Sequence, residues 1–245
     1  MKRKFVNLLL KSRRVNYYNK KNKIFYKVQN SPNFKVLNFG KRNKNKFFYV
    51  IKRVKGGGLF SNLLFVLNHL IIADNLKFIP VIDMENFTNL YNNKNKINGT
   101  FNSWLYYFQP VSKYNLSEVY KSKNVIFSTE EIFNGQSLSY KENKIKLIKV
   151  FKKYIKIKPK FIKEAEVFSK KNNINSDTLG VHWRGTDHKV LPNHPLPPNK
   201  KQILDAIKKA NFKRKFKNIF LVTEQKKYVQ VLEKNINNLV YFKSF

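Results

Sequence analysis

A strand, a glycine turn, a helix and a second strand are predicted in succession by residues 47–83, which read FFYVIKRVKGGGLFSNLLFVLNHLIIADNLKFIPVID. Residues 47–54 are β-branched and aromatic, as strands are, and three glycines at 56–58 end that run. The apolar residues that follow recur at helical spacing: Phe60, Leu63, Leu64, Leu67, Leu70 and Ile71. A short apolar run at 78–82 completes the pattern. The stretch therefore predicts a βαβ unit.

Strands and helices alternate again in the second half of the chain. Short apolar and β-branched runs predict strands at 178–183, 218–222 and 239–242. Apolar residues at helical spacing predict helices between them, around 203–210 and 228–232. This alternation favours an α/β architecture built on parallel sheets.

The segment between these two parts is less regular. Residues 84–140 are predicted to be irregular, with aromatic clusters and turns. Two helices are predicted after them, one marked by apolar residues from Ile145 to Ile155 and one that begins at Pro159, because proline is favoured at the first helical position. The last part has room for about three strands before Phe245, so we expect an incomplete second domain in a truncated chain.

The charge of the chain is strongly positive. Fifty Lys and Arg residues against 14 Asp and Glu residues give a formal net charge of +36. Only seven of the fifty are Arg, and the lysines are scattered among Asn, Ile, Phe and Tyr, the amino acids of A/T-rich codons. Coding bias therefore explains much of the charge, and we expect no dedicated nucleic-acid binding. The charge still predicts attraction to anionic nucleotides and peripheral association with anionic membranes at low salt.

Several classes of protein are excluded by what the sequence lacks. Without cysteine, the chain has no disulfide scaffold, no cysteine zinc site and no thiol nucleophile. The apolar N-terminal stretch is interrupted by Asn7, and no small-residue cleavage site follows, so we expect no signal peptide. Residues 59–73 are too short and too polar to span a bilayer. We expect a cytoplasmic or membrane-peripheral protein.

The glycine turn is the first stretch that can face a ligand. Gly56, Gly58 and Ser61 come close to the G-x-G-x-x-G fingerprint of dinucleotide-binding proteins, and Asp83 ends the next strand. Because Ser61 replaces the third glycine, NAD binding, a general ligand-facing loop and a plain tight turn remain alternatives. Asp83 and Glu85 also resemble a D-x-D metal site, but this spacing is common by chance, and we expect no metal.

The second stretch is HWRGTD, residues 182–187, at the end of a predicted strand. If residues 178–184 are extended, His182 and Arg184 lie on the same face, at the carboxyl edge where open α/β sheets bind ligands. The fork of a guanidinium suits bidentate contact with phosphate. Asp187 can orient Arg184, cap the following turn or accept a proton. A salt-bridged strand end without function is the alternative.

The third stretch is IFLVTE, residues 219–224, a buried strand followed by a hydroxyl and a carboxylate. The side chains of Thr223 and Glu224 can contact a sugar or a base edge. Equally, Thr223 can serve as the N-cap of the next helix.

Together these stretches resemble the GDP-fucose-dependent fucosyltransferases, the group of the α1,6-fucosyltransferases and protein O-fucosyltransferases. The resemblance rests on H-x-R-G-T-D at 182–187, on the strand with Thr-Glu at 219–224, and on the glycine turn with Asn62 opening a helix. It covers roughly residues 45–245. NSWLYYFQPVS, residues 102–112, is similar to uncharacterised members of the same superfamily.

The resemblance implies a GT-B-like α/β fold with two Rossmann-like domains, the second incomplete. On this basis we expect a basic leader over 1–45, an acceptor-side domain over 46–172 and a partial donor-binding domain over 173–245. The resemblance also implies an inverting, metal-independent transfer of fucose from GDP-fucose, without a further cofactor, to a glycan or protein acceptor.

Roles for individual residues follow from the same resemblance. Arg184 would hold the β-phosphate and offset the charge on the departing GDP. The other implied contacts are Gly58, Asn62, His182, Thr223 and Glu224. Inversion also needs a base for the acceptor hydroxyl, for which Asp187, Asp83 and Glu85 are the candidates. The α1,6 members carry a second arginine where this chain has Gly185, which leaves the linkage open.

Two other functions stay open at this stage. One is a different nucleotide-sugar enzyme or an NAD-dependent enzyme built on the same βαβ unit. The other is a basic protein without catalysis that binds nucleic acid or an anionic surface, in which Arg184 has no special role.

Overall fold

A computed structural model describes residues 35–53, 58–128, 140–185 and 196–242 of the chain. The chain divides into two compact units, one ending at Phe161 and one beginning at Ile162. This division falls inside helix α7 (Pro159–Lys171), whereas the sequence placed the domain boundary after residue 172. The two units are described separately below.

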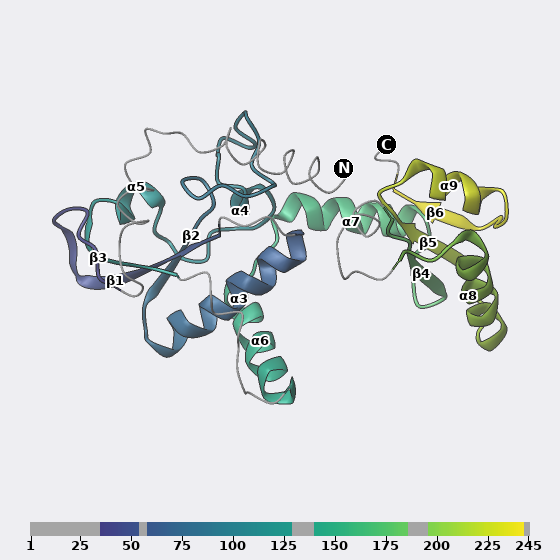
Figure 1. The fold of residues 1–245 in the computed structure, drawn as a ribbon, viewed down its shortest axis with the longest axis horizontal. Helices are drawn as coiled ribbons and strands as arrows, with labels where there is room; N and C mark the ends of the chain where they lie inside the picture. The colour runs from purple at the N-terminus through teal and green to yellow at the C-terminus, as the bar shows by residue number, and fades with distance from the viewer. Residues whose placement is uncertain (1–34, 54–57, 129–139, 186–195, 243–245) are drawn as a thin grey trace, which may run out of the picture. The chain divides into compact units, whose positions relative to one another are not determined.

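The first unit is built on a parallel sheet whose strand order is β2-β1-β3 (Figure 1). β1 (Arg42–Lys52) pairs in parallel with β2 (Ile79–Asp83) on one side and with β3 (Ser122–Phe127) on the other. Helix α3 (Leu59–Asn75) connects β1 to β2. The predicted βαβ unit is thus confirmed.

The central strand β1 is completely buried over Phe48–Ile51, and its side chains alternate between two cores. Tyr49 and Ile51 pack with α3 and with α6 (Tyr140–Tyr154) on one face of the sheet. Phe48 and Val50 pack on the other face with residues around the short helix α5 (Leu116–Val119). A strand buried on both faces explains the unbroken apolar run in the sequence.

Two expectations for this unit were wrong. The first strand begins at Arg42, five residues before the predicted start, because its exposed first half has no apolar pattern. The segment 84–140 is not wholly irregular, since it holds β3, α4 (Trp104–Tyr107) and α5. Both helices are one turn long, and β3 has only six residues, so none of them carries enough periodicity to be recognised.

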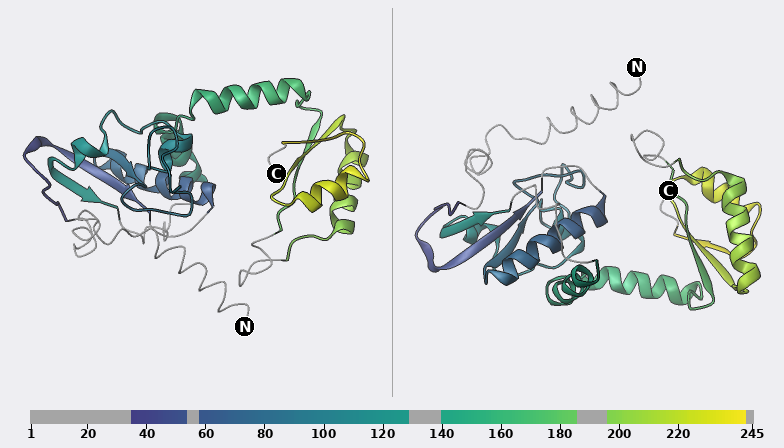
Figure 2. Two further views of the ribbon diagram at one scale, coloured as in Figure 1. Left: turned by 90° about the horizontal axis from the view of Figure 1, so that it is seen from above. Right: turned by 60° about the horizontal axis from the view of Figure 1, so that its bottom comes forward.

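The second unit contains a second parallel sheet, with strand order β4-β5-β6. Its strands are β4 (Thr178–His182), β5 (Asn218–Val222) and β6 (Leu239–Tyr241). The helices α8 (Lys200–Lys213) and α9 (Lys226–Glu233) share one core with one face of the sheet (Figure 2). Phe168 of α7 contacts Phe220 and Phe242 on the other face. These elements match the predicted strands and helices closely.

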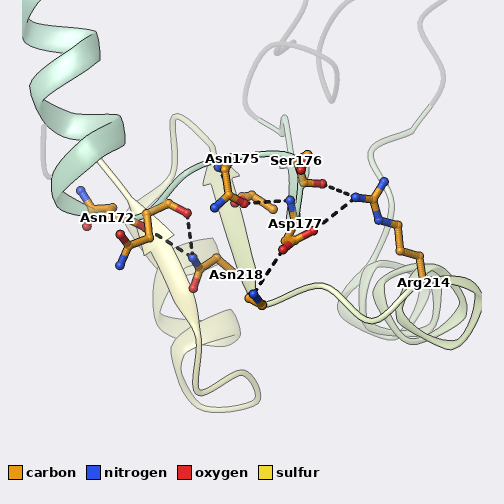
Figure 3. Close-up of polar contacts among 9 residues, drawn as sticks. Asn172, Asn175, Ser176, Asp177, Arg214 and Asn218 are labelled. Carbon is orange, nitrogen blue, oxygen red and sulfur yellow. Dashed lines mark hydrogen bonds and ion pairs between the residues drawn. The ribbon is translucent and has the colours of Figure 1, made fainter.

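A polar network fixes the amino ends of β4 and β5 (Figure 3). The backbone oxygen of Asp177 accepts a hydrogen bond from Lys217 N at 2.8 Å, and its carboxylate lies 3.4 Å from Arg214. Arg214 Nη2 also donates to the backbone oxygen of Ser176 at 2.7 Å, and Asn218 Nδ2 donates to Asn173 O at 3.2 Å. The network sets the register of the strands and hence the positions of the residues that follow them.

Within the described ranges, every helix is too short or too polar to cross a lipid bilayer.

Candidate functional site

The segments after β4 and β5 meet at the carboxyl edge of the second sheet. His182 and Val222 are paired in the parallel register, and Trp183 N donates to Val222 O at 3.0 Å. Parallel strands end on the same side, so the residues that follow these two strands are neighbours. The structure therefore brings together the predicted stretches 182–185 and 223–224.

The strand-like alternation continues past the end of β4. His182 and Arg184 are exposed, whereas Trp183 and Gly185 between and beyond them are buried. The Trp183 ring stacks on Tyr228 of α9 with centroids 3.9 Å apart, and its Nε1 donates to Pro198 O at 3.0 Å. The buried indole thus anchors the segment that carries Arg184.

Gly185 joins the two stretches directly. Its backbone N–H donates to Oε1 of Glu224 at 2.6 Å. A Cβ at this position would lie 2.7 Å from Cε2 and 2.9 Å from Cζ of Tyr228, and closer still to the hydroxyl. The approach of Tyr228 therefore explains why glycine follows Arg184, and the bond to Glu224 holds the turn in place.

Thr223 is not the N-cap of the following helix, so that alternative is wrong. Gln225 occupies the N-cap position of α9, and Thr223 Oγ1 accepts from Gln225 N at 3.2 Å in a local turn. Its hydroxyl proton stays available to an acceptor. Asp187, expected next to Arg184, lies outside the described residues.

The other predicted contacts lie in the first unit, at the start of α3. Gly58 precedes the helix, is exposed and has open space around a built Cβ. Its backbone oxygen accepts from the N–H of Asn62 at 3.0 Å, and Asn62 itself is buried. Gly56 lies outside the described residues. The position of Gly58 and Asn62 beyond the carboxyl end of β1 is the usual ligand-binding position in α/β sheets.

Asp83, at the end of β2, is fully enclosed by protein donors. Its carboxylate accepts from the backbone N–H groups of Glu85 at 3.0 Å and Asn86 at 2.8 Å, from Asn86 Nδ2 at 2.9 Å, and from the Tyr120 hydroxyl. Burial raises the pKa of this carboxyl group. Asp83 therefore closes a turn and is not placed to bind a ribose, a metal ion or an acceptor hydroxyl. This enclosure counts against the hypothesis that the βαβ unit binds NAD.

Glu85 differs from Asp83 because its side chain reaches solvent. Partial burial and the charge of Asp83 raise the pKa of the Glu85 carboxyl group. Across the part of the chain that the structure describes, no three His, Asp or Glu side chains gather closely enough to hold a metal ion.

A buried asparagine beside β2 was missed by the sequence analysis as a site residue. Asn102 Nδ2 donates to Ile82 O at 2.7 Å, and its Oδ1 accepts from Met84 N at 3.3 Å and Trp104 N at 3.2 Å. Its amide thus takes the place of a neighbouring strand at the end of β2. Asparagine is abundant in this chain, so the residue type alone gives no signal. The aromatic and apolar residues that follow Asn102 in the stretch 102–112 are the sequence feature that could have indicated its burial.

Comparison with known proteins gives a match in structure alone. No known protein family model matches the sequence, and no curated protein is similar to it. A crystal structure of NodZ α-1,6-fucosyltransferase soaked with GDP-fucose superposes with a TM-score of 0.53. The match has 13% sequence identity and covers 82% of this chain and 79% of that one. The chain has the NodZ fold.

Two more NodZ structures match over similar lengths. The α-1,6-fucosyltransferase co-crystallised with GDP has a TM-score of 0.50 at 14% identity and covers 82% of this chain and 79% of that one. The enzyme from Bradyrhizobium has a TM-score of 0.48 at 12% identity over 81% and 79%. The match with a TM-score of 0.53 at 13% identity establishes the fold alone, and the expected α/β, GT-B-like architecture with parallel sheets is confirmed.

Proposed function

We propose that the chain is a glycosyltransferase that moves fucose from GDP-fucose to a hydroxyl group of a glycan or protein, with inversion at the sugar carbon. The observation that carries this proposal is the meeting of Arg184-Gly185 with Thr223-Glu224 at the carboxyl edge of a parallel sheet. Open α/β sheets bind nucleotides at that edge. The fold shared with an α-1,6-fucosyltransferase whose crystal was soaked with GDP-fucose supports the same function.

Arg184 carries the chemistry in this proposal. Cleavage of the sugar–phosphate bond leaves negative charge on GDP, and a guanidinium can bind two phosphate oxygens at once. Trp183 and Gly185, both buried, hold the backbone on either side of the arginine. A preorganised cation of this kind typically contributes about 10²–10³ in rate. It would also replace a divalent cation, so a chelator should leave transfer unchanged.

The remaining residues are assigned around this arginine. His182, exposed on the same side of β4, would support the phosphate contact. Thr223 and Glu224 would lie against the donor, with Glu224 positioned by Gly185 N. Gly58 and Asn62 would add further contacts to the bound substrate, and Asp187 would act as base. The partners are thus a nucleotide-sugar donor and a hydroxyl acceptor.

Replacement of Arg184 by Ala tests the proposal. We expect transfer from GDP-fucose to fall by about 10²–10³, because the charge on the leaving GDP is no longer offset. The melting temperature should stay within a few degrees of wild type, because the side chain is exposed. Arg42→Ala is the matched control, since it removes an exposed arginine at the start of β1 in the other sheet.

Ligand binding distinguishes the proposal from the alternatives. GDP should raise the melting temperature of the wild-type chain, and NADH should not. Full transfer activity in Arg184→Ala would overturn the assigned role of the arginine, and stabilisation by NADH instead of GDP would favour a dinucleotide enzyme.

A further inference from the structure

Helix α6 exposes a stripe of apolar side chains to solvent. Ile145, Ile148 and Phe151 are 62%, 45% and 39% exposed. Because they are spaced three residues apart, they follow one another along one side of the helix. Among the helices that the structure describes, none exposes more large apolar side chains than α6 does. Neighbouring exposed apolar side chains of this kind mark a site of interaction with a protein or a membrane.

The stripe lies outside the packing face of α6. Leu147, Val150 and Tyr154 belong to the core that α6 shares with α3 (Figure 1). The Tyr154 hydroxyl donates to Oδ1 of Asp74 on α3 at 2.9 Å, and Lys153 forms an ion pair with the same carboxylate. These contacts fix the rotation of α6 about its own axis, so the stripe stays exposed in the folded first unit.

Lysines surround the stripe. α6 contains six lysines and one acidic residue, Glu142. Three of the lysines lie four residues from an isoleucine of the stripe and are exposed: Lys144, Lys149 and Lys152. A lysine can lay its hydrocarbon stem along an apolar surface while its ammonium group reaches outward. An apolar stripe bordered by lysines is typical of helices that lie in the interface of an anionic bilayer.

Charge and polarity together decide between the partners that could cover the stripe. A second copy of the chain would place six lysines opposite six lysines, which repel one another. Nucleic acid would neutralise the lysines and leave the isoleucines against water or phosphate. An anionic bilayer satisfies both kinds of side chain, because its headgroups attract ammonium groups and its acyl chains take up apolar ones.

Helix α8 shows that a basic helix does not by itself form such a stripe. It contains five lysines and one acidic residue, Asp205. Its Ile203 and Ile207 are buried in the core of the second unit, and Phe212 is the single large apolar side chain exposed along this fully described helix. α8 therefore serves as the internal comparison for α6.

We propose that α6 docks the protein on an anionic membrane surface. The helix lies in the headgroup region, with Ile145, Ile148 and Phe151 inserted among the acyl chains and the lysines at the anionic headgroups. The contact is peripheral, because α6 has 15 residues and no helix in the described ranges can cross a bilayer. This inference does not rest on the proposed function, since it uses no residue of the site at 182–185 and 223–224.

A single cysteine can report the insertion, because the chain has no cysteine of its own. The full chain carrying Ile148→Cys, labelled with the fluorophore NBD, is mixed at low salt with phosphatidylserine vesicles. We expect its emission to shift to shorter wavelength and to brighten, because the probe enters the apolar region. Phe212→Cys, labelled in the same way, is the matched control, since Phe212 is 93% exposed on the basic helix α8. The emission of this control should stay as it is in water.

A double variant that preserves the charge tests the same stripe by cosedimentation. Ile145→Gln combined with Ile148→Gln leaves the net charge at +36. It should weaken partition onto phosphatidylserine vesicles about tenfold, because two inserted apolar side chains are lost. Phe212→Gln should sediment as wild type does. All three replacements are at exposed positions, so the melting temperatures should stay near that of wild type.

Several results would overturn the proposal. One is that wild type does not sediment with phosphatidylserine vesicles at low salt. Another is that the label at position 148 stays in water, or shifts no more than the label at position 212, on vesicles that do sediment the protein. In that case the general charge of the chain would be sufficient for binding. Equal partition of the double variant and Phe212→Gln would have the same meaning. A label at position 148 that responds to duplex DNA and not to vesicles would assign the stripe to nucleic acid.

Discussion

At the level of single residues, Gly185 shows why a glycine follows the arginine in the H-x-R-G-T-D motif. The glycine next to Arg184 is required by the ring of Tyr228, which lies within 3 Å of where a Cβ would be. Tyr228 itself is stacked on Trp183 and cannot move without disturbing the core. The motif therefore places the exposed cation Arg184 directly before a glycine that close packing requires.

Gly185→Ala should lower the free energy of unfolding by about 1–3 kcal/mol, as overpacked core sites do. Urea denaturation measures the loss. Gly180→Ala, within β4, is the matched control, because a Cβ there meets no atom within 4 Å, and the stability of this variant should stay near wild type. Equal stabilities of the two variants would contradict this prediction, because they would show that the Tyr228 ring moves aside for the extra methyl group at little cost.

Asp83 should make the stability of the protein depend on pH. Burial raises the pKa of its carboxyl group in the folded state, so the folded state holds that proton more tightly than the unfolded chain does. Stability should therefore fall as pH rises from the ordinary aspartate range through the raised pKa. The partly buried Glu85 contributes a fall in the same direction.

Asp83→Asn should flatten this fall, because the amide does not ionise. Tyr120→Phe should steepen it, because the Tyr120 hydroxyl stabilises the ionised carboxylate. Urea denaturation between pH 4 and pH 7 follows both variants. A wild-type stability that falls no more steeply over this range than that of Asp83→Asn would contradict the raised pKa of Asp83.

At the level of structural elements, the side chain of Asn102 makes hydrogen bonds at the end of β2 that a neighbouring strand would otherwise supply. Asn102→Ala would leave Ile82 O, Met84 N and Trp104 N without their present partners. We expect a loss of about 3 kcal/mol in the free energy of unfolding, since buried groups without partners are costly. Asn95→Ala, in the exposed loop before it, should cost less than about 0.5 kcal/mol in the same denaturation experiment.

The elements that could be predicted from sequence are those with a sustained pattern. The βαβ unit and the second sheet follow from apolar runs and helical periodicity, and Pro159 begins α7 as expected. β3 was missed because six residues between irregular segments give no period. The exposed start of β1 was missed because its pairing with β3 depends on the backbone and not on apolar side chains.

The candidate site was predictable to a lesser degree. The adjacency of residues 182–185 and 223–224 follows from parallel pairing, and the structure brings these stretches together. The enclosure of Asp83 could not be foreseen, because Tyr120 comes 37 residues later in the chain.

For the whole molecule, the net charge of +36 should give salt-dependent adsorption that is independent of catalysis. Cosedimentation with phosphatidylserine vesicles should be strong at low salt and fall steeply as salt rises, because counterions screen the lysines. Phosphatidylcholine vesicles are the control and should bind little. Arg184→Ala should leave adsorption unchanged, since one charge in fifty is removed. A loss of adsorption in that variant would tie Arg184 to surface binding.

The parallel pairing of β1 has a consequence for synthesis on the ribosome. Its partner β3 is made much later, as the contact between Asn43 and Ser122, 79 positions apart, illustrates. At a synthesis rate of roughly 5–20 residues per second, the apolar segment Phe48–Ile51 of the nascent chain stays exposed for several seconds before β3 is made. Chaperone capture during translation, and poor yield when translation outpaces it, are the behaviours to expect of this polypeptide.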